Sequence, residues 1–499
     1  MEASLADLKR RLAEIDDLQR TQLLLAWDTE VWMPPSGERS RGAQLATLET
    51  IVHDRQIDDR IGELLDDVEP YASTLPADAD DACLVRVVRR RWEKKRRIPT
   101  DLAAEIAGAQ VESYQAWVKA REETRFADFR PSLERVLELQ RRLIECFAPY
   151  DDPYDVVLDD YEEGAKTEDV RIIFAALQPE ITALVAEHAG EEDEDGFLRG
   201  PFAIPAQEAL SRELIERFGA TWDAFRLDLT VHPFAAPVGL HDIRLTTRYG
   251  EDDLNSLFTA MHECGHGLYE WGSAPSLERT PLQGALASSA LHESQSRLWE
   301  NVVGRSLPFW RWFYPRVQAA FPEALAYVSL ERFHRAVNRP RRGFIRVDAD
   351  ETSYGLHVIL RFELEQELLS GRLAVKDLPD AWNARFTELV GLEVPNDTVG
   401  VLQDSHWASG LFGYFPTYLL GTVLSVQIWE QARAALPGVE DQLERGEFAD
   451  LHEWLRENLY ALGSKFTPAE TIERIAGGPI DPQPYLRYLR EKLNALAAA

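Results

Sequence analysis

Apolar residues at three- and four-residue steps run through most of this 499-residue chain. The segment 4–25 shows this spacing at Leu5, Leu8, Leu12, Ile15 and Leu18. The same period recurs in four further segments: 38–52, 79–97, 101–122 and 131–147. Such a period places an apolar stripe along one face of a helix, and that stripe must be buried against other elements. The chain therefore predicts a mainly α-helical fold, and its 45% hydrophobic content is sufficient for a large core.

Strand-like alternation of polar and apolar residues is confined to two segments, 226–231 and 242–249. These predict a small β-sheet beside the helices. The chain has no internal repeat and no Ser/Gly-rich linker, so we expect one structural unit over residues 1–499. An acidic stretch at 187–195, expected as an exposed loop, divides this unit into an N-terminal helical half (1–195) and a second half (196–499).

The most specific local signal is the string His262-Glu263-Cys264-Gly265-His266. On a helix, His262 and His266 lie one turn apart on the same face. Two such imidazoles can bind zinc, and Glu263 can act as general base on a metal-bound water. Roughly 0.02 accidental matches to this pattern are expected in a chain of this length and composition. The alternative is a surface helix that carries two histidines by coincidence.

The sequence around the string is itself helical. Acidic residues 251–253 precede it, as suits a helix N-terminus, and Gly272 is a plausible helix end. Apolar positions with helical spacing flank it: Leu254, Leu257, Phe258, Met261 and Leu268. The string is therefore expected on an amphipathic helix.

A catalytic zinc site needs a third protein ligand. Downstream, 284–299 has helical composition, with His292 and Glu293 in its middle. A single glutamate in mid-helix is ordinarily a solvated surface residue. The small residues at 285 and 287–290 instead favour Glu293 as the third ligand, because they allow the close helix packing that a shared metal requires.

The chain resembles the carboxypeptidase Taq family of zinc metallocarboxypeptidases over nearly its whole length. The segments that carry the resemblance occur in the family's order: 27–35, 154–162, 232–234, 242–246, 262–266, 292–295, 345–350 and 400–407. The resemblance implies a mostly helical fold with a deep central groove, a small sheet beside the active-site helix, and a homodimer. It implies release of single amino acids from peptide C-termini, with broad specificity, in the half 196–499. The half 1–195 would then form part of the groove wall.

Residue by residue, the resemblance implies that His262, His266 and Glu293 bind one zinc ion per chain. It implies that Glu263 is the general base. Cobalt or manganese could occupy a site with these ligands, so the sequence leaves the metal open.

The resemblance also assigns residues that contact the substrate. Arg346 would bind the terminal carboxylate, and His406 with Tyr418 would stabilise the oxyanion. Tyr414 is a companion of that pair, and Arg244 lies near the site.

These residue types suit those roles. A guanidinium matches a carboxylate with two parallel hydrogen bonds. Arg346 lies in a short apolar run, and a buried ion pair with Asp348 or Asp350 is the alternative. The stretch 406–421, punctuated by Gly and Pro, is typical of a loop entering a helix, although core packing also explains its tyrosines.

The formal net charge of −31 is strongly acidic, and only 8 of the 54 basic residues are lysines. This composition favours a salt-adapted, halophilic host, with an acidic mesophilic enzyme from a GC-rich genome as the alternative. It argues against nucleic-acid binding, which needs a basic surface. One basic run, 86–97, could form such a surface, but a solvated helix face paired with nearby acids is favoured.

Three cysteines, Cys83, Cys146 and Cys264, are too few for a disulfide framework and fit a reducing compartment. Cys264 is expected to pack rather than ligate, because it does not share the face of the two histidines. Residues 1–7 lack the layout of a signal peptide, and no apolar run has membrane-spanning length. We expect a cytoplasmic protein that acts on peptides, with no membrane or nucleic-acid partner.

Two alternatives to a zinc carboxypeptidase stay open. A zinc oligopeptidase or dipeptidyl-type peptidase would share the metal ligands and differ in the carboxylate-binding arginine. A non-catalytic peptide-binding protein belongs to another class, and the intact Glu263 argues against it because binding alone does not need that base.

Overall fold

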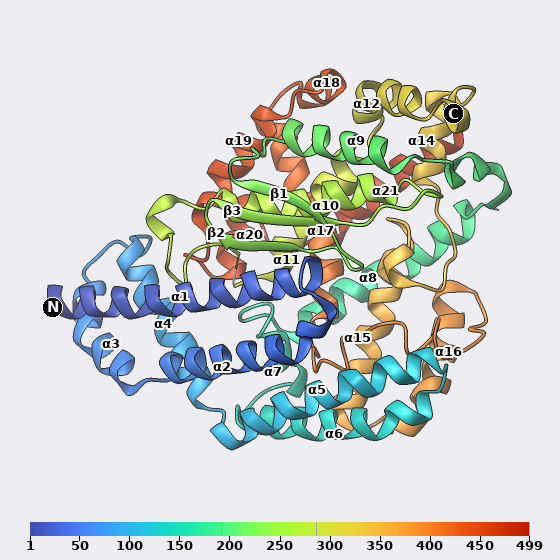
Figure 1. Cartoon of the computed structure of the whole chain (residues 1–499). Coiled ribbons are helices and arrows are strands. Elements are labelled where there is room, and N and C mark those ends of the chain that lie inside the picture. Colours follow the sequence, from blue (N-terminus) through green and yellow to red (C-terminus); the bar gives the residue numbers. More distant parts are fainter. Residues whose placement is uncertain (191, 286, 499) are drawn as a thin grey trace.

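The computed structural model describes residues 1–190, 192–285 and 287–498. Helices dominate it, and one small sheet lies among them (Figure 1). The helices before the sheet are α1 (Glu2–Val31), α2 (Glu38–Gln56), α3 (Asp59–Ala72), α4 (Asp80–Arg96), α5 (Thr100–Glu122), α6 (Phe126–Glu145), α7 (Pro153–Leu158), α8 (Thr167–His188) and α9 (Ile204–Arg217). The helices after it are α10 (Asn255–Trp271), α11 (Ser289–Arg297), α12 (Leu307–Ala320), α13 (Pro322–Leu325), α14 (Leu330–Asn338), α15 (Tyr354–Ser370), α16 (Leu378–Val390), α17 (Phe415–Ala435), α18 (Val439–Arg445), α19 (Ala449–Asn458), α20 (Pro468–Ala476) and α21 (Pro482–Ala498).

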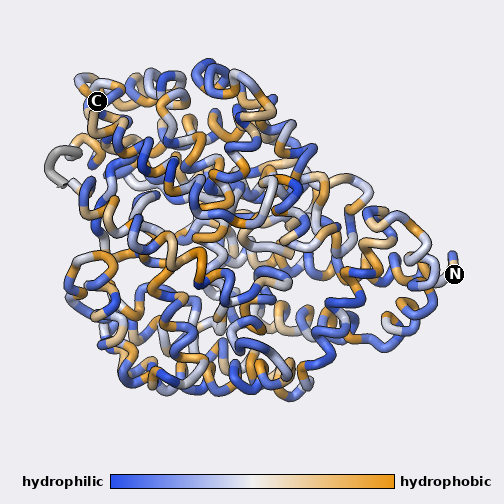
Figure 2. The backbone as a smooth tube through the Cα atoms, turned by 180° about the vertical axis from the view of Figure 1, so that it is seen from behind, coloured by the Kyte–Doolittle hydropathy of each residue, from blue (hydrophilic) through white to orange (hydrophobic). Residues whose placement is uncertain are grey.

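The mainly helical class is confirmed, and the five periodic segments correspond to α1, α2, α4, α5 and α6. Helix α3 was not predicted. Gly62 and Pro70 interrupt its pattern, although Gly62 is needed there because a Cβ would lie 2.4 Å from the Trp92 ring. Figure 2 shows hydrophobic and hydrophilic residues alternating along many of the helices, as the period predicts.

The sheet contains β1 (Phe225–Leu229), β2 (Ala235–Gly239) and β3 (Asp242–Thr247) in the order β1-β3-β2. Strand β3 runs parallel to β1 and antiparallel to β2. The two predicted strands are β1 and β3. Strand β2 was missed because its sequence, Ala-Ala-Pro-Val-Gly, has no alternation and contains Pro237, which an edge strand tolerates.

The sheet packs directly on α10. Ile243 and Leu245 of β3 are fully buried, and a Cβ on Gly267 of α10 would lie within 3.0 Å of side chains from β1 and β3. Helix α10 ends at Gly272, as predicted, and the Asp253 carboxylate accepts a hydrogen bond from the Asn255 N–H at its start. The sheet predicted beside the helix that carries residues 262–266 is therefore confirmed (Figure 1).

Helix α11 is held between α10 and α17 at two glycines. A Cβ on Gly265 would lie 2.5 Å from the Gln295 carbonyl oxygen, and one on Gly421 would lie 2.7 Å from the Glu293 Cβ. The prediction that this helix begins at 284 was wrong. It begins at Ser289, because the Ser288 side chain caps it, and after Arg297 the chain continues as a π-helix, Leu298–Val303.

One large core of buried apolar residues extends from α5 to α21 and crosses position 195, so the two proposed halves share it. Their division at that point stays a prediction. A smaller core joins α1, α3 and α4.

The basic run on α4 pairs with acids, as favoured: Arg90 and Lys94 lie 2.6 and 2.5 Å from the Asp159 carboxylate. Among the described residues, no helix combines the length and apolar character needed to cross a membrane.

Gly265→Ala should lower the free energy of unfolding by about 2 kcal/mol or more, because the added methyl group forces α10 and α11 apart. Denaturant titration measures this change. Gly108→Ala on α5 is the matched control, since open space surrounds Gly108 and alanine favours the helix there. Equal stability of the two variants would contradict the close packing.

Candidate metal centre

The three predicted metal ligands converge. His262 and His266 extend from α10, Glu293 extends from α11, and their ligand atoms all lie within 4.8 Å of one another. The Nε2 atoms of His262 and His266 lie 3.8 and 3.5 Å from Oε2 of Glu293. Two imidazoles and a carboxylate at these separations fit one divalent ion bound about 2 Å from each atom.

Glu300 fixes the orientation of His262. The His262 Nδ1 lies 2.9 Å from Oε2 of Glu300, so an Nδ1–H donated to this carboxylate leaves the Nε2 lone pair for a metal. Burial alone would raise the pKa of Glu300, but the His262 hydrogen bond and the Arg297 charge lower it to about 2. Sequence reasoning missed Glu300, since its direction depends on the π-helix that follows α11.

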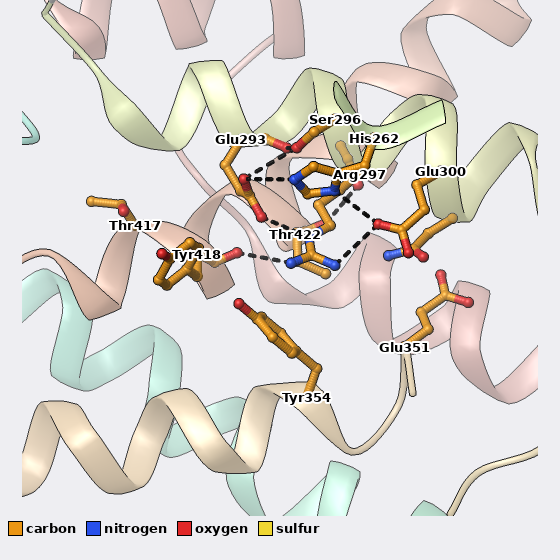
Figure 3. A network of polar contacts seen from close by, with 12 residues as sticks. His262, Glu293, Ser296, Arg297, Glu300, Glu351, Tyr354, Thr417, Tyr418 and Thr422 are labelled. Atoms are coloured by element: carbon orange, nitrogen blue, oxygen red, sulfur yellow. Dashed lines mark hydrogen bonds and ion pairs between the residues drawn. The ribbon is translucent and has the colours of Figure 1, made fainter. Parts of the chain in front are cut away.

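Arg297 connects the ligand Glu293 to Glu300 (Figure 3). Its Nε donates to Oε1 of Glu293 at 2.7 Å, and its Nη1 donates to Oε2 of Glu300 at 3.3 Å. Burial opposes ionisation of Glu293, yet Arg297 and His262 hold the pKa of this carboxyl well below its usual range. Glu293 is therefore ionised, which is the form that binds a cation.

Glu263 lies between the two histidines and is buried. Burial raises the pKa of its carboxyl to about 7, which suits a group that must both accept and release a proton near neutral pH. Cys264 is fully buried in the large core, as the packing interpretation expected, and burial raises the pKa of its thiol.

His292 supports His266 from one side. The two rings stack with centroids 4.3 Å apart, and the His292 Nε2 lies 3.2 Å from Oε1 of Glu270. Burial, with the neighbouring His292, lowers the pKa of His266 to about 3. His266 is thus neutral over the physiological range, as a ligand imidazole must be.

Arg346 is buried in an ion pair, but with neither of the partners suggested by the sequence. Its Nε and Nη2 donate to Oδ1 of Asp404 at 3.1 and 2.9 Å, while its Nη1 donates to the Tyr354 hydroxyl at 2.9 Å. Asp350 instead accepts hydrogen bonds from the backbone N–H groups of Thr352 and Ser353. Within the described part of the chain, three of the five N–H groups of Arg346 have these acceptors, which leaves two.

Asp404 forms an ion pair with a second arginine, Arg361, through its other carboxylate oxygen. The Nε of Arg361, on α15, donates to Oδ2 at 2.7 Å. Despite burial, the two guanidinium groups lower the pKa of Asp404, so the carboxylate stays charged. The position of Arg346 is therefore set by a residue 58 positions away in the chain.

His406, Tyr418 and Tyr414, which are predicted to act together, lie close to one another. The His406 Nε2 lies 3.2 Å from the Tyr418 hydroxyl, and the Tyr414 ring crosses that of Tyr418 edge to face with centroids 5.1 Å apart. Burial lowers the pKa of His406 to about 3. Burial and then the nearby Glu293 charge raise the pKa of Tyr414 to about 12, so the Tyr414 phenol and the His406 imidazole are both neutral.

The loop before α17 rests on the buried carboxylate of Glu365. This group accepts hydrogen bonds from Trp407 Nε1 at 2.8 Å, the Gly413 N–H at 3.1 Å and the Tyr154 hydroxyl at 2.5 Å. A loop that enters a helix here was predicted, and α17 begins at Phe415. Glu365 was not predicted, because nothing near it in the sequence marks it as a partner of this loop.

Arg244 does not join this cluster. Its guanidinium forms two hydrogen bonds of 2.9 Å with Asp242 and lies 4.2 Å from the centre of the Trp27 ring of α1. Because side chains alternate along a strand, Arg244 faces away from α10, onto which Ile243 and Leu245 pack.

Comparison with known proteins identifies the family. The model of the carboxypeptidase Taq (M32) metallopeptidase family matches residues 7–493. The chain belongs to this family. It is 40% identical to thermostable carboxypeptidase 1 of Thermus thermophilus over 485 residues, covering 95% of each chain, and 34% identical to carboxypeptidase 1 of Bacillus subtilis, covering 98% of this chain and 97% of that one.

Solved structures agree. The M32 carboxypeptidase from Deinococcus radiodurans R1 superimposes with a TM-score of 0.95 at 40% identity, covering 100% of both chains. Metallocarboxypeptidase 1 of Trypanosoma cruzi gives a TM-score of 0.92 at 31% identity, covering 99% of this chain and 100% of that one. This M32 chain is therefore a metallocarboxypeptidase, a hydrolase whose family implies a divalent metal.

Glu300→Ala should weaken metal binding about 10- to 100-fold, because His262 loses the acceptor that orients it. Competition with a chromogenic chelator measures the metal dissociation constant. Glu363→Ala is the matched control, since this glutamate also pairs with an arginine, Arg385, but lies outside the centre. Equal metal affinity of both variants would show that Glu300 does not orient His262.

Proposed function

We propose that this M32 carboxypeptidase is zinc-dependent and releases single amino acids, with broad specificity, from the C-termini of peptides. The observation that carries the proposal is the buried Glu263 beside the converging ligand atoms of His262, His266 and Glu293. A base with a pKa near 7 next to a cation site suits hydrolysis by an activated water.

When bound, zinc would polarise the scissile carbonyl and lower the pKa of water. Glu263 takes a proton from the attacking water and delivers it to the leaving amine. Tyr418 and His406, 3.2 Å apart, act as donors to the developing oxyanion, a contribution of about 3 kcal/mol per donor in comparable sites. Tyr414 packs against Tyr418 and keeps its ring in place.

Arg346 binds the terminal carboxylate in this proposal. Its two remaining N–H groups match the two oxygens of a carboxylate, while Asp404 and Tyr354 fix the guanidinium. Arg244 stays a predicted substrate contact, although Asp242 and Trp27 hold its guanidinium against α1.

Zinc is the proposed metal because two imidazoles and one carboxylate are a frequent catalytic zinc set, and cobalt or manganese at the same ligands would leave the residue roles unchanged. The homodimer, the cytoplasmic location, the deep groove walled partly by residues 1–195 and the halophilic host stay predictions from the sequence.

A mixed peptide pool tests the proposal. The purified protein is incubated with it in low and high salt, with and without a chelator, and the products are identified by mass spectrometry. We expect chelator-sensitive ladders that differ by one residue at the C-terminus. Internal cuts or dipeptide release would support the oligopeptidase or dipeptidyl alternative, and the absence of products in every condition would support a non-catalytic peptide binder.

Glu263→Gln should keep the metal and lower kcat by about 100-fold or more, because the amide cannot accept the water's proton. Metal content by elemental analysis and kcat on a tripeptide check both halves of the prediction. Near-normal turnover by a metal-loaded variant would exclude Glu263 as the base.

Arg346→Ala should reduce kcat/KM for peptides with a free C-terminal carboxylate about 100-fold, and far less for the same peptides amidated, because the lost contact is to the carboxylate. Arg385→Ala, which breaks a partly exposed ion pair with Glu363, is the control. An equal loss on acid and amide would count against the assignment of Arg346.

A further inference from the structure

Tyr354 is a buried tyrosine, 5% exposed, at the first residue of α15. Its hydroxyl accepts the hydrogen bond from Nη1 of Arg346 at 2.9 Å. The Arg297 guanidinium lies 4.4 Å from the centre of its ring. Tyr354 therefore contacts two arginines, Arg346 through its hydroxyl and Arg297 through its aromatic face. Figure 3 shows Arg297 and Tyr354.

The two arginines pair with different carboxylates of the site. Arg297 is bonded to the metal ligand Glu293 at 2.7 Å. Arg346 is bonded to Asp404 and carries the two N–H groups assigned to the substrate's carboxylate. Glu293, Arg297, Tyr354 and Arg346 thus form a continuous chain of contacts from the metal ligands to the residue that binds the chain end.

We propose that Tyr354 is a specificity-determining positioning residue that sets the separation between the metal ligands and Arg346, and thereby the one-residue step of cleavage. The proposal deepens the proposed function and rests on it. Only the leaving amide nitrogen and one Cα lie between the scissile carbonyl carbon and the terminal carboxylate. The two binding points must therefore be held at one separation, since small misplacements of a reacting group are costly.

A tyrosine suits this task. Its ring is rigid and has few torsions to restrict, and a cation prefers the face of an aromatic ring. The Tyr354 ring also meets the ring of the oxyanion residue Tyr418 edge to face, with centroids 6.2 Å apart. The Tyr354 side chain therefore contacts Arg346 and Tyr418 directly, and it contacts the candidate ligand Glu293 through Arg297.

Two substitutions separate the contacts. Tyr354→Phe keeps the ring under Arg297 and removes the acceptor for Arg346. We expect KM for free-acid peptides to rise about tenfold, with kcat within about threefold, amidated peptides unaffected and metal affinity unchanged. Tyr354→Leu removes both contacts. We expect it also to weaken metal affinity several-fold by chelator competition and to release some dipeptides along with single residues.

Tyr314→Phe is the matched control, because that buried hydroxyl also donates a hydrogen bond, to the Val328 carbonyl oxygen, outside the site. It should match the wild type in every measurement. Circular dichroism establishes folding, and Tyr354→Phe alone decides the proposal if Tyr354→Leu does not fold.

The proposal is overturned if Tyr354→Phe behaves as the wild type on free-acid peptides, or if it loses acid and amide substrates equally. Failure of the proposed function would give a different result: the metal-loaded wild type would release no single residues. Single-residue ladders that are identical in wild type, Tyr354→Phe and Tyr354→Leu would contradict only the assignment of Tyr354.

Discussion

The close approach of α10 and α11 is the constraint on which the rest of the site depends. The candidate ligand atoms of His262 and His266 on α10 lie 3.8 and 3.5 Å from that of Glu293 on α11, and such distances are favoured when the two backbones are in near contact. Gly265 permits it, since a Cβ there would overlap the Gln295 carbonyl oxygen. Gly421 permits α17 to approach the other side of α11, so the helix that carries Glu293 has no room to move.

Around that contact, the site is built from buried charges that neutralise one another. Arg297 lies between Glu293 and Glu300, and Asp404 lies between Arg346 and Arg361. Burying charged groups costs free energy, and their mutual attraction offsets this cost only when the ion-pair geometry is good. These pairs are therefore better explained by the orientation they give to the side chains than by a gain in the stability of the fold. Each of these contacts fixes the direction of a side chain in the candidate site.

Much of the fold followed from periodicity alone. Helical segments were predicted where one face is continuously apolar, and β1 and β3 where polar and apolar residues alternate. Predictions failed where local pattern and tertiary contact disagree: α3 carries Gly62 because Trp92 needs the space, and β2 contains Pro237 because it lies at the sheet edge. The start of α11 was misplaced because its cap, Ser288, follows a run of equally good helix formers.

By itself, the sequence identified two candidate metal ligands, His262 and His266, because residues one helical turn apart share a face. Glu263 between them was identified as the candidate base from the same motif. Resemblance to the family added Arg346, His406 and Tyr418. Only the tertiary structure decided what surrounds them, namely Glu300 on His262, Asp404 on Arg346 and Tyr354 between two arginines. The partner of a buried charge is selected by distance in space, which local spacing along the chain does not encode.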